Sequence, residues 1–206
     1  MKRIAIAAIL AIAGAMPTAA IARADIWDFL KAERIATDEM LEPTEYGTRD
    51  LNRTDLRGRD LRGRDLSGRS LQGVDLRGAD LSGAELDNAN LSGSNLEGAD
   101  LREAQLAWTN LSFTKLSGAD LRGANLWGAN IVQSNLDRAN LSGAVLTFAN
   151  LGDSYFNETN LANTNLDYAN FGNAKFHRTN LTNAKYDLTF FTNRQLGDAI
   201  GYRPGR

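Results

Sequence analysis

The sequence predicts an all-β solenoid, in which the chain winds into coils that stack on one another. A five-residue pattern recurs from about Arg49 to Leu196, over most of the 206 residues. Its central residue is Leu, Ile, Phe or Tyr at all thirty positions spaced by five from Leu51, and glycine often stands two residues later. Self-similarity at a fixed, short period is typical of repeat architectures.

Residues 1–24 are expected to be a signal peptide that takes no part in the fold. The start is basic, residues 4–16 are apolar, and Ala22-Arg23-Ala24 offers a small-residue cleavage site. The apolar stretch is too short to span a bilayer comfortably, and an uncleaved membrane anchor is the alternative. We therefore expect a periplasmic or secreted protein, cleaved after Ala24 and not membrane-spanning after cleavage.

Cysteine and charge limit the function classes. The chain has no cysteine, so the fold must rest on packing without disulfides. After residues 1–24, twenty basic side chains face twenty-five acidic ones. Residues 25–48 hold seven acidic and two basic side chains, which accounts for the whole excess. The repeats themselves are therefore neutral, which argues against nucleic acid as a partner.

The period of five requires a turn in every unit. In a helix, each step of five residues would rotate the apolar residue by about 140° and scatter it around the axis. In a continuous strand, an odd spacing would place successive apolar residues on opposite faces. Glycine at twelve positions from Gly58 to Gly143 supplies the backbone freedom that such turns need. The coils are then expected to stack through parallel backbone hydrogen bonds.

Units such as Ala79-Asp80-Leu81-Ser82-Gly83 resemble the pentapeptide-repeat family, whose pattern is A(D/N)LXX. The resemblance covers about residues 49–196. It implies a right-handed quadrilateral parallel β-helix of pentapeptide repeats with four units per coil. Residues twenty apart would then lie above one another, which suits the pairs Phe156/Phe176 and Phe171/Phe191. The spacings of fifteen among these residues leave a triangular coil open.

The predicted organisation continues with a cap at each end of the repeats. Residues 25–45 are expected to form a short N-terminal capping α-helix, because residues 26–41 are amphipathic and Pro43 follows. A free helix that binds another partner is the alternative. The β-helix would then occupy residues 46–196, followed by a C-terminal tail over 197–206.

Four arginines depart from the pattern, because they stand where it prefers Ala, Ser or Thr. A guanidinium buried alone would be very unfavourable, so we expect ion pairs with the acidic N-terminal segment. The alternative is that distorted early units let the arginines reach solvent. The residues predicted to form these N-terminal ion pairs are Arg49, Arg59, Arg64, Arg69, Glu33, Glu39 and Glu42.

The C-terminal units end in aromatic residues, as is common in the family that they resemble. Tyr186, Phe190 and Phe191 stand just before the pattern is lost. They can cap the last coil or form a homodimer contact, and the outward position of Phe190 favours the contact.

No catalytic residue, metal site or cofactor is predicted. The single histidine, His177, lies in a polar unit and is expected to face solvent. A column of carboxylates at Asp60, Asp80, Asp100 and Asp120 suggests Ca²⁺ binding, but arginines two residues further along favour charge compensation. The column continues with asparagines that suit amide ladders.

Outward aromatic residues are the best candidates for partner binding. Folding at twenty residues per coil aligns them in one column, with one tryptophan beside it. These candidates are Trp108, Trp127, Phe148, Tyr168 and Leu188. The alternative is that they only cover a corner of the coil.

The first functional hypothesis is a non-catalytic periplasmic protein-interaction or scaffolding module that binds an unknown protein or an envelope glycan. A structural solenoid without a defined ligand is the second. The best-understood members of the family mimic DNA and bind gyrase, which would require an acidic face and a cytoplasmic location. That function is a remote alternative.

Overall fold

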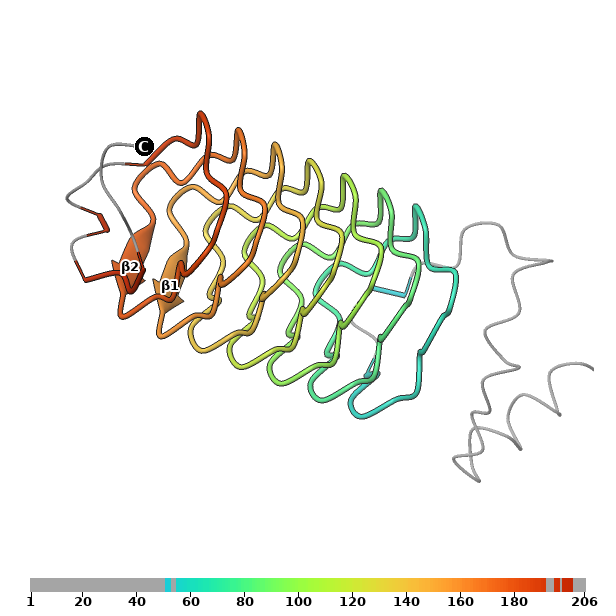
Figure 1. Cartoon of the computed structure of the whole chain (residues 1–206). Coiled ribbons are helices and arrows are strands. Elements are labelled where there is room, and N and C mark those ends of the chain that lie inside the picture. The colour runs from blue at the N-terminus through green and yellow to red at the C-terminus, as the bar shows by residue number, and fades with distance from the viewer. Residues whose placement is uncertain (1–50, 53–54, 192–194, 197, 202–206) are drawn as a thin grey trace, which may run out of the picture. The chain divides into compact units, whose positions relative to one another are not determined.

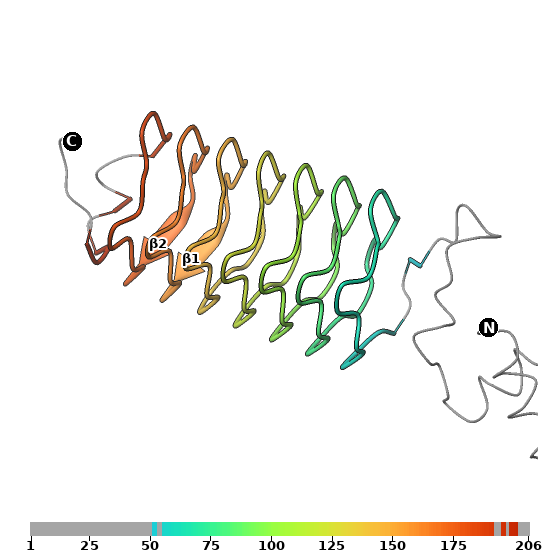
Figure 2. The ribbon, with the colours of Figure 1, turned by 45° about the vertical axis from the view of Figure 1, so that its right-hand side comes forward.

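The computed structural model describes residues 51–52, 55–191, 195–196 and 198–201, which wind into a stack of coils (Figure 1, Figure 2). Every backbone bridge is parallel, and every bridge joins residues twenty apart, from Asp55 with Asp75 to Asn180 with Ile200. Four five-residue units therefore complete one coil. The quadrilateral coil is confirmed, and the triangular alternative is wrong.

Most units repeat one set of backbone hydrogen bonds, as the unit around Leu121 illustrates. The N–H of Leu121 donates to the carbonyl of Asn140 at 2.7 Å, and the N–H of Gly123 donates to the carbonyl of Ser142 at 3.1 Å. These two bonds tie one coil to the next. The N–H of Ala124 returns to the carbonyl of Leu121 at 3.1 Å and closes the corner. Leu121 and Ala124 point inward and are fully buried.

Regular strands are short in this solenoid. Within the described residues the strands are β1, Tyr155–Asn157, and β2, Lys175–His177, which pair in parallel with Phe156 opposite Phe176. The other backbone pairings between coils within the described residues are isolated bridges. A period of five leaves about three extended residues before each turn, so the expected all-β coil forms without long sheets.

The corners share one backbone conformation. Every fifth residue from Gly58 to Leu188 has a positive φ, as the third residue of a type II turn requires. Glycine adopts this conformation readily, as the sequence predicts. Fifteen non-glycine residues adopt it too, at about 1–2 kcal/mol of strain per ordinary residue. The glycine rule therefore covers only some of the corners.

Where Asp or Asn precedes the central residue, its side chain supports the corner that follows. Its side-chain oxygen accepts the N–H of the residue two positions on, at 3.1 Å from Ser142 to Asn140 and at 2.9 Å from Gly172 to Asn170. Asp and Asn favour such local turns because their side chains are short enough to reach their own backbone. This contact explains the second position of the repeat.

Aromatic residues fill the interior near the C-terminal coils. The rings of Phe156 and Phe176 are stacked with centroids 5.3 Å apart, and those of Phe171 and Phe191 are 6.2 Å apart. Both pairs predicted from the twenty-residue spacing are therefore adjacent. Phe156 and Phe171 are fully buried.

Several sequence predictions lie outside the described residues. These are the signal peptide, the capping helix over 25–45, most of the C-terminal tail, and Arg49, Glu33, Glu39 and Glu42 of the predicted ion pairs. Within the described residues, no helix is long and apolar enough to cross a membrane.

The remaining three arginines lie at the first described coil. Arg59, Arg64 and Arg69 are half-buried, and their carbonyl oxygens accept hydrogen bonds from the next coil. They begin inward columns that continue with buried alanines in that coil. Three arginines therefore stand at inward positions of the repeat in the first described coil, and their side chains are only partly buried.

Candidate interaction surface

One corner of the solenoid carries a row of aromatic side chains, which we call the aromatic ridge. It consists of Trp108, Trp127, Phe148 and Tyr168. The rings of Trp108 and Trp127 meet edge to face with centroids 4.7 Å apart, and Trp127 meets Phe148 in the same way at 5.9 Å. Phe148 and Tyr168 are stacked at 4.9 Å. The four rings form one continuous surface over successive coils.

The ridge is exposed despite these contacts. Trp108 is 56% exposed, Phe148 and Tyr168 are each 51% exposed, and Trp127 is 36% exposed. Leu188, the fifth predicted residue, is exposed at the same corner one coil beyond Tyr168. The structure thus brings four of the five candidates into ring contact and places the fifth in line with them.

Gly128 makes room for the indole of Trp108. A Cβ on Gly128 would lie 2.7 Å from Cε3 and 2.8 Å from Cζ3 of Trp108, which is closer than real contacts allow. The six-membered ring of Trp108 therefore lies over the backbone of Gly128. Because Gly128 has no side chain, the tryptophan can pack against the next coil, although bulky residues follow in the same column.

A flat face of amides borders the ridge, and we call it the amide face. Its asparagines stand at every twentieth residue: Asn90, Asn110, Asn130, Asn150 and Asn170. The Nδ2 of Asn130 donates to Oδ1 of Asn110 at 3.4 Å, and that of Asn170 donates to Oδ1 of Asn150 at 3.1 Å. Sequence reasoning missed this ladder, although the unbroken run of Asn at twenty-residue spacing is its signal.

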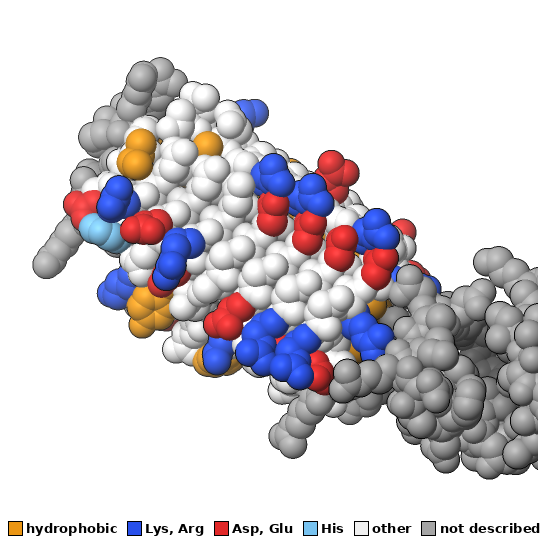
Figure 3. All heavy atoms as spheres, turned by 90° about the horizontal axis from the view of Figure 1, so that it is seen from below, with side chains coloured by type: hydrophobic (Ala, Val, Ile, Leu, Met, Phe, Trp, Pro, Cys, Tyr) orange, Lys and Arg blue, Asp and Glu red, His pale blue; other side chains and the backbone are white. Residues whose placement is uncertain are grey.

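The predicted charge compensation on the carboxylate column is present. The Nε of Arg62 donates to Oδ1 of Asp60 at 2.8 Å and lies 3.7 Å from Oδ2 of Asp80 in the next coil. Asp100 and Asp120 accept equivalent bonds from the arginines two residues on. Figure 3 shows rows of adjacent basic and acidic side chains along the coils. These carboxylates are engaged by arginine, so the structure gives no support to a Ca²⁺ ladder.

The ion pair with Arg62 shifts the titration of Asp60. Hydrogen bonds from the side chain and the backbone N–H of Arg62 lower the pKa of Asp60 from 3.8 to about 2. A carboxyl with a lowered pKa stabilises the fold above pH 4, and this contribution is lost as the pH falls toward 2. The pair is exposed, so its contribution to stability is small.

An Arg62→Gln variant is expected to raise the pKa of Asp60 from about 2 toward 3.8, because the charged donor is lost. The carboxyl ¹³C shift of Asp60, followed by NMR between pH 1.5 and 6, measures this change. Arg138→Gln, which lies several coils away along the stack, should leave the midpoint of Asp60 unchanged. A midpoint for Asp60 near 4 in the unmodified protein would contradict the ion pair.

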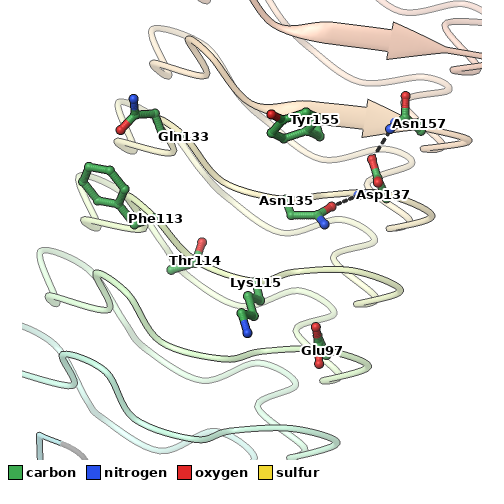
Figure 4. Close-up of a pocket in the computed structure, with 9 residues that line it drawn as sticks. All are labelled: Glu97, Phe113, Thr114, Lys115, Gln133, Asn135, Asp137, Tyr155 and Asn157. Carbon is green, nitrogen blue, oxygen red and sulfur yellow. Dashed lines mark hydrogen bonds between the residues drawn. The ribbon is translucent and has the colours of Figure 1, made fainter.

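A second surface feature is an open hollow of about 550 Å³ on another side of the coil (Figure 4). Three of its residues depart from their columns. Phe113 stands where the two preceding coils have glycine, and Lys115 and Tyr155 stand on either side of Asn135 in their column. All three are exposed, and none of the hollow's charged side chains is buried. We assign it no ligand.

The C-terminal coils and the histidine were also singled out in the sequence. Phe190 and Ile200 are exposed, and Phe190 lies beside Gly172. Nδ1 of His177 lies 3.2 Å from Oδ2 of Asp198, and both side chains are exposed. His177 therefore faces solvent, as the sequence predicts.

The sequence model of the family described as Pentapeptide repeats matches the chain in overlapping segments, over residues 50–86, 70–106, 104–143, 119–157 and 144–183. These matches span well over half of the chain. No curated protein matches the chain.

Solved structures that match the chain include two pentapeptide repeat proteins and a fluoroquinolone resistance protein. HetL, a pentapeptide repeat protein involved in heterocyst differentiation regulation from the cyanobacterium Nostoc sp., is 24% identical, covering 80% of this chain and 94% of that chain, with a TM-score of 0.40. Rfr23 from the cyanobacterium Cyanothece is 27% identical over 81% and 100% of the two chains, with a TM-score of 0.32. A trypsin-treated form of QnrB1, a plasmid-mediated fluoroquinolone resistance protein, is 18% identical over 73% and 89%, with a TM-score of 0.50.

Proposed function

Because the chain belongs to the pentapeptide-repeat family, whose members fold as right-handed quadrilateral β-helices, we propose that it is a non-catalytic interaction module that binds its partner through the aromatic ridge. The observation that carries this proposal is the continuous row of exposed rings over successive coils. Large aromatic side chains gathered on a solvated surface are a mark of binding sites.

The ridge keeps bulky side chains at corners where glycine would be less strained. Trp108, Phe148 and Tyr168 have φ values of 58°, 61° and 60°, in a region where bulky residues are rare. Glycine occupies the same position in many other coils and would remove the strain. Fifteen non-glycine residues share this conformation, so what distinguishes the ridge from the other corners is its row of exposed, touching rings.

The surroundings of the ridge support binding rather than catalysis. A catalytic histidine needs a substrate pocket beside it, but His177 and its partner Asp198 are both exposed. Members of the family are generally structural, non-enzymatic folds. DNA mimicry needs a strongly acidic face, and the carboxylates of Asp60, Asp100 and Asp120 are instead paired with arginines.

The proposal also includes the cellular location of the protein. We place the protein in the periplasm or outside the cell, because residues 1–24 have the features of a signal peptide. Sequencing of the mature N-terminus tests this assignment, and a mature protein that begins at Met1 would exclude it.

We further propose caps at both ends of the stack. The acidic segment 25–48 would cover the N-terminal end and meet the half-buried Arg59, Arg64 and Arg69. The exposed Phe190 and Ile200 would form a homodimer contact at the other end. Sedimentation that shows only monomers at high concentration would exclude the dimer.

The ridge can be tested by replacing its rings with glycine, which suits the left-handed backbone and keeps the coil folded. A Phe148→Gly, Tyr168→Gly double variant is expected to bind the envelope fraction of its own cells at least about tenfold more weakly. Co-sedimentation of purified protein with that fraction measures this change.

Arg138→Gly is the matched control, because Arg138 has the same backbone conformation, with φ 60°, on another corner. It should bind like the unmodified protein. Equal binding by the ridge variant would leave the aromatic side chains as cover for the corner.

A further inference from the structure

We propose that the amide face and the aromatic ridge together bind an extended, neutral polysaccharide that lies along the axis of the coils. This inference rests on the proposed function, because it names the partner of the same surface. It assigns the hydrogen bonds to the amide face and the apolar contacts to the ridge.

The amides of this face are held in position by bonds within the solenoid. Oδ1 of Asn110 accepts hydrogen bonds from the N–H of Ser112 at 3.1 Å and from its hydroxyl at 2.8 Å, besides the bond from Asn130. Oδ1 of Asn150 accepts the N–H of Gly152 at 3.4 Å and the amide of Asn170.

These bonds leave donors for a ligand. Each asparagine amide has two N–H groups, and a bond along the ladder uses one of them. The second N–H can donate to an acceptor outside the protein. A row of rigid donors repeated once per coil suits a polymer with many hydroxyl and ring oxygens, because little entropy is lost on binding.

The backbone beside the asparagines forms the floor of the amide face, and glycines line this floor near its C-terminal end. Gly152 and Gly172 lie beside the asparagines without the left-handed φ that would require glycine there. Glycine is therefore not required there by the backbone conformation. Its missing side chain leaves space beside the asparagines. A Cβ on Gly172 would lie 3.7 Å from the ring of Phe190, which marks the C-terminal end of the floor.

The ridge supplies an apolar edge along this floor. Trp108 lies over Gly128 and is still 56% exposed, so part of its ring is open to a ligand. Sugar rings bind to such aromatic side chains through their apolar C–H groups. Amide donors beside exposed aromatic rings are the two contacts that a neutral sugar chain can use.

The chemistry of the face favours a neutral glycan over a peptide or a charged polymer. A peptide strand adds to a sheet through unused backbone groups, but here the N–H of Asn130 already donates to Thr109 and that of Ile131 to Asn150. The face from 89–92 to 169–172 contains no Asp, Glu, Lys or Arg. An anionic polymer would need arginine or lysine there.

The test uses the purified full-length mature protein in a Trp27→Phe background, so that fluorescence reports Trp108 and Trp127. The probes are cellohexaose and chitohexaose, which are extended and neutral, and hexagalacturonate, which is anionic. We expect a saturable change in tryptophan emission with at least one neutral probe. An Asn130→Ala, Asn150→Ala variant should raise the dissociation constant about tenfold or more.

The second asparagine ladder gives a matched control. The Nδ2 of Asn160 donates to Oδ1 of Asn140 at 3.1 Å on a side without aromatic side chains. Asn160→Ala should therefore bind the neutral probe normally, and an equal loss in this variant would overturn the proposal. Equal or tighter binding of hexagalacturonate would also overturn it.

The outcomes separate this inference from the proposed function. If neither neutral probe binds while the Phe148→Gly, Tyr168→Gly variant still loses envelope binding, the glycan inference is wrong and the ridge keeps its role. If the ridge variant binds the envelope normally, both proposals are wrong.

Discussion

An Ala119→Arg variant is expected to lose the folded solenoid, with a free energy of unfolding lower by more than about 4 kcal/mol. Ala119 is buried in a central coil, and its carbonyl accepts the N–H of Asn140 at 2.9 Å. Ala99 and Ala139 occupy the same inward column and are also buried. A guanidinium in this column would have neither water nor a partner. Urea unfolding followed by circular dichroism measures the loss.

Ser82→Arg is the matched control for the added charge. Ser82 lies two residues after Asp80, so the substitution creates another Asp-Leu-Arg unit like the one at Asp60. Its stability should change by less than about 0.5 kcal/mol. A folded Ala119→Arg variant of ordinary stability would show that the inward columns admit charge.

The proposed N-terminal cap can be tested with Arg69→Ala. This variant removes a charge from an inward position of the repeat, whereas Ala119→Arg adds one. If segment 25–48 pairs with the inward arginines, this variant should lose hydrogen-exchange protection in residues 55–75 before the central coils. Unchanged protection there would exclude a cap that depends on Arg69.

The coil could be predicted because the repeat constrains it at every unit. A period of five with an apolar centre requires one turn per unit, and the pairs Phe156/Phe176 and Phe171/Phe191 indicated the twenty-residue coil. The backbone of the corners was predicted only in part. Glycine signals a left-handed residue, but Trp108 and fourteen other non-glycine residues adopt the same conformation, because bonds between the coils impose it.

The site was less predictable than the fold. Aligning the sequence at twenty residues per coil placed Trp108, Phe148 and Tyr168 together, because side chains in one column share a direction. The ring contacts of Trp127 and the packing of Trp108 over Gly128 depend on side-chain rotamers, which the repeat does not specify. The amide face was missed because A(D/N)LXX treats every Asn as ordinary, and only its unbroken column distinguishes it.

A Phe156→Ala variant is expected to lose about 3–5 kcal/mol of local stability. Phe156 is fully buried, stacks on Phe176 and meets Phe171 edge to face with centroids 5.4 Å apart. Removing the ring would leave a cavity beneath β1 and β2, where the coils carry the regular strand pairing. Solenoids can open locally, so hydrogen exchange at residues 155–177 is the suitable measurement.

Phe156→Leu separates the filling of the interior from the aromatic contacts. Leucine is the usual central residue of the repeat, so it fits the backbone and fills most of the space, and its cost should stay below about 1.5 kcal/mol. The edge contact with Phe171 and the stack with Phe176 would both be lost in this variant. If Phe156→Leu were as damaging as Phe156→Ala, ring contacts rather than volume would hold the C-terminal coils together. If both variants cost less than 1 kcal/mol, the interior there would be loosely packed, contrary to the burial of Phe156.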